Sequence, residues 1–145
     1  MNREIQLHDG ELLEVIQADG VTSIIFSTAY IHESAGVPGY HPGLVWRQPA
    51  RITIEHALPV SLVVVPPIWV IGGCLRAGQT TYRHFIPASG EFEGEAELEL
   101  VLSTEDGADG GTLNIKGNGV KIELFGEASE AEKFDERPRR SIDED

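Results

Sequence analysis

The sequence contains little of several residue types, and each shortage excludes a class of protein. Of 145 residues, one is cysteine, one is methionine, and 11 are lysine or arginine against 24 aspartates and glutamates. The single cysteine, Cys74, cannot form a disulfide within the chain, which excludes a disulfide-stapled secreted domain. The net charge of -13 argues against nucleic acids and anionic membranes as partners, because both are bound through basic side chains.

Long apolar runs are scarce as well. The longest, residues 57–75, contains prolines at positions 59, 66 and 67 and glycines at 72 and 73. A membrane-spanning helix tolerates few such breaks, so two buried strands separated at Pro66-Pro67 fit better. The first residues include no apolar segment of the signal-peptide type. We therefore expect a cytoplasmic protein.

Helical periodicity is weak, and apolar residues recur with a period of two over most of the chain. The clearest example is residues 91–103, in which five glutamates alternate with mostly apolar residues. Alternation of this kind predicts a strand with one buried face and one solvated face. We interpret the glutamates as the solvated face, which also discourages edge-to-edge aggregation.

Turn residues divide the rest of the chain into further strands. Asn-Gly supplies the positive φ angles of a tight turn, so Gly117-Asn118-Gly119 predicts a hairpin over residues 112–126. Asp9-Gly10 and Asp19-Gly20 are further turn signals. The expected strands cover residues 5–8, 12–17, 21–33, 51–55, 61–65, 68–71 and 80–86, and loops are expected at 35–43 and 104–111.

Eight or nine strands with frequent turns and no long helix predict a single all-β domain over residues 1–128. An antiparallel β-sandwich and a small β-barrel both accommodate such a set, and the sequence leaves these two open. Residues 129–145 are set apart as a tail. Ser129-Glu130-Ala131-Glu132 has the pattern of a capping box, which predicts a short helical turn through about residue 137. We expect the remaining acidic tail to be disordered.

Charge and aromatic residues are distributed unevenly. Residues 20–90 contain only two acids, Glu33 and Glu55, and four arginines. The same stretch holds four of the five histidines and most of the aromatic side chains. One interpretation is that these are simply the central strands of the domain. The other is that part of this stretch forms a pocket or a subunit interface, since both favour Tyr, Trp and Arg.

The loop at 35–43 and the residues after it are the strongest candidate for a site. Loops on a rigid β scaffold are where binding residues concentrate. An aromatic ring beside an arginine offers stacking and a bidentate contact to an anion, and Arg47, Arg51 or Arg83 can hold a small anionic ligand. The predicted ligand-binding residues are Tyr40, His41, Trp46, Arg47, Tyr82 and His84. The competing interpretation is that the loop is a hydrophobic plug at one end of the domain.

An alternative hypothesis is a metal-dependent enzyme. His32 and Glu33 precede the loop and His41 lies within it, so these side chains can converge with His84 on one divalent metal. Their spacing matches no metal-binding motif.

Motifs for nucleophilic or nucleotide-dependent catalysis are missing from the sequence. There is no Gly-x-Ser-x-Gly, no P-loop and no dinucleotide fingerprint, and Cys74 reads as a small buried hydrophobe. We therefore expect a non-enzymatic domain, without a cofactor, that binds a small ligand or a protein partner and forms a homodimer.

Overall fold

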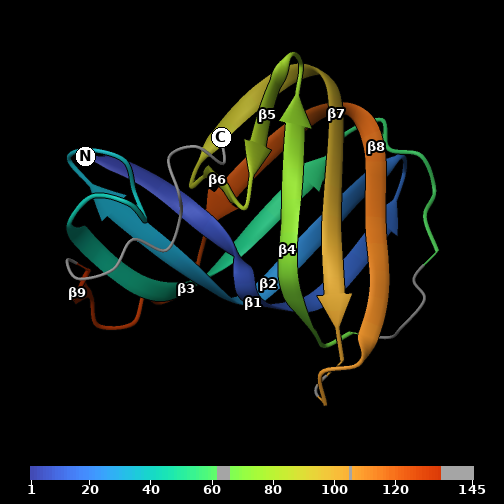
Figure 1. Ribbon diagram of the computed structural model, residues 1–145. Coiled ribbons are helices and arrows are strands. Elements are labelled where there is room, and N and C mark those ends of the chain that lie inside the picture. The colour runs from blue at the N-terminus through green and yellow to red at the C-terminus, as the bar shows by residue number, and fades with distance from the viewer. Residues whose placement is uncertain (62–65, 105, 135–145) are drawn as a thin grey trace.

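The computed structural model describes residues 1–61, 66–104 and 106–134 of the chain (Figure 1). These residues form nine β-strands and no helix, so they include none long and apolar enough to cross a membrane. The strands are β1 (Asn2–Ala18), β2 (Val21–Ser34), β3 (Gly43–Ile54), β4 (Ile68–Ala77), β5 (Thr80–Arg83), β6 (Phe85–Pro87), β7 (Gly90–Ser103), β8 (Asp109–Leu124) and β9 (Glu132–Phe134).

Six of the strands close a barrel. Neighbours pair antiparallel in the order β4-β7-β8-β3-β2-β1, and β4 returns to β1 through the pairs Glu11–Trp69 and Leu12–Ile68. Figure 1 shows β4, β7 and β8 side by side, with β1, β2 and β3 crossing behind them at a steep angle. The structure confirms the predicted all-β antiparallel fold and selects the barrel.

The barrel interior is filled by one face of each long strand. In β7 the side chains of Ala96, Leu98, Leu100 and Leu102 are buried, whereas four of the five glutamates of the strand are exposed, as predicted. The other barrel strands contribute further fully buried side chains, among them Leu12, Ile24, Phe26, Ile31, Ile52, Ile54 and Leu75. This alternation is what the period of two in the sequence reflects.

One glutamate of β7, Glu97, is more than a solvated side chain. It accepts a hydrogen bond from Asn114 Nδ2 at 2.8 Å and pairs with Arg76 Nη2 at 2.5 Å. The Asn114 hydrogen bond is the main reason that the pKa of Glu97 is lowered, and partial burial opposes it. The carboxylate therefore ties β4, β7 and β8 together on the outer surface of the barrel.

The predicted hairpin at residues 112–126 is wrong, because β8 runs through Gly117-Asn118-Gly119 without turning. Its pairing with β7 continues there through Glu95–Asn118 and Ala96–Gly117. The segment after β3 crosses this point, and Asn118 N donates to Glu55 O at 2.7 Å. The glycines thus allow two backbones to approach each other closely, and the chain does not reverse at this point.

Asp9-Gly10 does not end a strand either. The prediction of separate strands at 5–8 and 12–17 is wrong, since β1 continues across a bulge at which Asp9 has a φ of 69°. Residues before the bulge pair with β6, and residues after it pair with β4. The bulge therefore lets a single strand serve two neighbours.

The helical turn predicted at Ser129 is wrong for the residues that the structure describes. Residues 132–134 form β9, which pairs antiparallel with the start of β3. The rest of that prediction, from residue 135 onward, lies outside the described residues, as does the expected strand at 61–65 apart from Ser61. The strand expected at 80–86 is split into β5 and β6 at His84, which has a φ of 66°.

Replacing Gly117 with alanine tests the backbone crossing. A Cβ there would lie 2.4 Å from the Glu55 carbonyl oxygen and 2.6 Å from the Ile54 side chain. We expect Gly117→Ala to lower the free energy of unfolding by about 1–3 kcal/mol in chemical denaturation. Gly72→Ala is the matched control, because its Cβ would meet only the His84 ring at 3.7 Å. Equal stability of the two variants would contradict the crossing.

Candidate ligand-binding site

A small second core lies beside the barrel, where the first residues of β1 pair with the last residues of β2. The buried His32 ring meets Phe85 edge-on at 5.4 Å and Phe134 at 5.1 Å between ring centroids. His32 Nε2 also shares a hydrogen bond of 2.9 Å with Gln6 Oε1. The loop between β2 and β3 packs onto this cluster, because a Cβ on Gly39 would lie 2.6 Å from the Phe85 ring.

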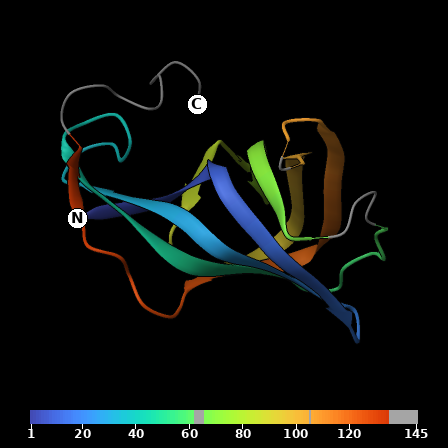
Figure 2. The same ribbon diagram turned by 90° about the horizontal axis from the view of Figure 1, so that it is seen from below.

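Residues 127–134, which we call the strap, run back along the first half of β3. Ser129 N donates to Arg47 O at 2.8 Å, and Arg47 N donates to Ser129 Oγ at 2.8 Å. Further along, β9 pairs with residues 43–45, and Phe134 is buried in the second core. Figure 2 shows the strap beside β2, β3 and their connecting loop, to one side of the barrel.

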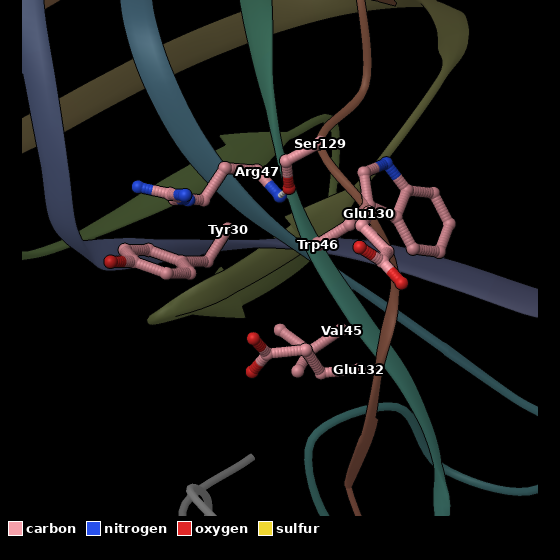
Figure 3. A pocket seen from close by; sticks show the side chains of 7 residues that line it. All are labelled: Tyr30, Val45, Trp46, Arg47, Ser129, Glu130 and Glu132. Atoms are coloured by element: carbon pink, nitrogen blue, oxygen red, sulfur yellow. Dashed lines mark hydrogen bonds between the residues drawn. The ribbon is translucent and has the colours of Figure 1, made fainter.

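A hollow of about 300 Å³ lies between β3 and the strap, and we call it the strap hollow. Figure 3 shows the Arg47 and Tyr30 side chains lying next to each other on one side of β3, with the Trp46 ring on the other side. The register explains this, since Tyr30 and Arg47 are direct cross-strand partners. The lining residues are Tyr30, Val45, Trp46, Arg47, Ser129, Glu130 and Glu132.

The strap hollow contains opposite charges that do not neutralise one another. Arg47 lines it together with Glu130 and Glu132. Within the described part of the chain, none of these three side chains takes part in an ion pair, whereas other arginines do, such as Arg3 with Glu33 at 2.5 Å. A guanidinium and two carboxylates are therefore available to a bound molecule.

The structure brings two of the six predicted ligand-binding residues, Trp46 and Arg47, into this hollow. Trp46 is engaged within the protein. Its Nε1 donates to Gln48 Oε1 at 3.0 Å, and the Arg3 guanidinium lies 5.5 Å from its ring centroid. Arg47 is thus the predicted residue whose side chain is best placed to meet a ligand.

The other four predicted residues lie elsewhere. Tyr40 and His41 are in the loop between β2 and β3, with their rings 5.0 Å apart, and His41 Nδ1 accepts a hydrogen bond from Val37 N. Tyr82 packs 6.3 Å from the Phe92 ring. His84 joins β5 to β6, and its backbone is bonded to Leu7 and Gly73. None of the four lines the strap hollow.

The residues proposed as metal ligands are engaged in separate contacts. His32 lies in the second core, Glu33 pairs with Arg3, and His41 and His84 have the partners just given. No three His, Cys, Asp or Glu side chains of the described residues lie close enough together to hold a metal ion.

A larger hollow of about 430 Å³ lies on the outer surface of β7 and β8, beneath residues 56–58. Two of its charged side chains, Arg76 and Glu97, already pair with each other, and Asn114 occupies the second Glu97 oxygen. The strap hollow is the better candidate, because its arginine is not engaged in this way.

Val45 lies in the segment directly after the loop, which the sequence predicts as part of the site, whereas the other four lining residues lie outside it: Tyr30, Ser129, Glu130 and Glu132. The position of Tyr30 beside Arg47 follows from the register of two strands, and that of the strap follows from a long-range pairing. Neither position can be predicted from the residues that are adjacent in the sequence.

Comparison with known proteins gives no relative for this chain: no family model, no curated protein and no solved structure matches it.

Truncating Phe134 tests how the strap is held. Because this side chain is the buried apolar anchor of the strap, we expect Phe134→Ala to speed amide hydrogen exchange at residues 129–134 at least tenfold. Exchange of the barrel amides at Ile52 and Ile122 should not change. Lys133→Ala, an exposed neighbour, is the control. Unchanged protection of the strap in Phe134→Ala would contradict this anchoring.

Proposed function

We propose that the protein is a non-enzymatic binding module that holds a small zwitterionic molecule in the strap hollow. The observation that carries the proposal is the presence of Arg47 and two glutamates around one hollow without an ion pair between them. A molecule with an ammonium group and a carboxylate supplies a partner for the arginine and a partner for a glutamate. The carboxylate would be held by Arg47, and the ammonium by Glu130 or Glu132.

The chemistry of the lining groups supports recognition. A guanidinium offers donors in a fixed planar arrangement that matches a carboxylate. The Tyr30 ring beside it provides an apolar surface for the carbon atoms of the ligand. The Ser129 hydroxyl oxygen is already engaged, because it accepts the Arg47 amide. It therefore holds the wall of the hollow in place.

Size narrows the class of ligand further. At about 300 Å³ the hollow is at the small end of the range for ligand sites. An amino acid or a compound of similar size fits such a volume. The sequence predicts an anionic ligand. The strap adds two carboxylates beside the arginine, so we propose a ligand that carries a positive charge as well.

A chain with one cysteine is suited to a reducing compartment, which supports a cytoplasmic location. The homodimer expected from the sequence stays a prediction, and light scattering at micromolar concentration tests it.

A series of amino acids of increasing length tests the binding proposal. We expect glycine, β-alanine, 4-aminobutyrate or 6-aminohexanoate to shift the amide resonances of Tyr30, Arg47, Ser129 and Glu132 in an NMR titration. Acetate and methylammonium carry only one of the two charges each, so they should bind more weakly. Equal binding of acetate would contradict the bridging arrangement.

The Arg47→Ala variant provides the second test. Because a hydrogen-bonded ion pair with the ligand carboxylate is lost, we expect its affinity for the best amino acid to fall about tenfold or more. Arg51→Ala is the matched control, since Arg51 lies on the same strand but pairs with Glu123 at 3.6 Å. An Arg47→Ala protein with undiminished affinity would refute the proposed site.

A further inference from the structure

The strap hollow does not end at Arg47. A second hollow of about 310 Å³ lies on the other side of this residue, and Arg47 and Ser129 line both. Its lining residues are Ser27, Thr28, Arg47, Gln48, Pro49, Glu127, Ala128 and Ser129. The two hollows adjoin at Arg47 and Ser129, and we call the surface that they make up along β3 and the strap the groove.

The groove is long enough for an elongated molecule. It follows β3 from Val45 to Pro49, a distance of about 13 Å for an extended strand. The strap is fixed near the middle by the two hydrogen bonds between Ser129 and Arg47. The wall formed by the strap is therefore held to β3 by one backbone hydrogen bond and one hydrogen bond to the Ser129 side chain.

Charges along the groove alternate in sign. Glu130 and Glu132 line the first hollow, Arg47 lies at the junction, and Glu127 lines the second hollow. Among the described residues, Glu127 resembles the other three in forming no ion pair. Glu11, by contrast, is occupied at the edge of this region, because it accepts a hydrogen bond from Ser27 Oγ.

We propose that the groove selects a basic amino acid, with an ammonium group at each end and a carboxylate near one of them. This inference rests on the proposed function. The carboxylate contacts Arg47, the α-ammonium lies against Glu130 and Glu132, and the apolar chain passes over the junction. The second ammonium group then reaches Glu127 in the second hollow.

Comparing lysine with norleucine isolates the second hollow, because both have the same carbon chain and only lysine carries the side-chain ammonium. We expect lysine to bind the wild-type protein about threefold to fivefold more tightly in an NMR titration, as for an exposed ion pair. In Glu127→Gln the difference should disappear, with norleucine affinity unchanged. Glu99→Gln, an equal change of charge on the exposed face of β7, should retain it.

The outcomes separate this inference from the proposed function. Equal affinities of lysine and norleucine for the wild-type protein would overturn the inference. A lysine preference that survives in Glu127→Gln would do the same. In either case, loss of binding in Arg47→Ala would still support the simpler zwitterion site. Absence of binding by both amino acids would overturn this inference alone if a member of the shorter amino acid series binds, and both proposals if none does.

Discussion

One edge of β3 is only half covered by the barrel, and the candidate site depends on how the other half is covered. On one side β3 pairs with β2 along its length, whereas on the other β8 reaches only residues 50–54. An uncovered strand edge leaves backbone donors and acceptors without partners. The strap supplies these partners at residues 43–45 and at Arg47, so the requirement for backbone pairing brings the strap beside β3.

The charge pattern of the site is a consequence of that pairing. Arg47 belongs to the acid-poor part of the sequence, and the strap brings Glu127, Glu130 and Glu132 to it from a distant acidic part. The net charge of the whole chain therefore says little about this surface. It still disfavours a polyanion as a partner, while the local pattern favours a small molecule with charges of both signs.

Features encoded locally could be predicted from the sequence, and features created by long-range contacts could not. The two faces of β7 follow from alternating residues. Gly117-Asn118-Gly119 has the composition of a turn, but the approach of Glu55 makes it a crossing point within β8. Serine is a residue type that caps helices, but the Ser129 hydroxyl instead accepts a hydrogen bond from Arg47 N at the edge of β3. The aromatic residues near Arg47 in the sequence predict this arginine as a ligand contact. The position of Tyr30 beside it follows only from the register in which β2 pairs with β3.

The most direct test of this account is the hydrogen bond between the strap and β3. In protein labelled with ¹⁵N and ¹³C, a scalar coupling across a hydrogen bond identifies its donor nitrogen and acceptor carbonyl. The account predicts such a coupling from the Ser129 amide nitrogen to the Arg47 carbonyl carbon. No coupling, together with exchange of the Ser129 amide at the rate of an unfolded chain, would show that the strap does not pair with β3 and that the site does not exist as described.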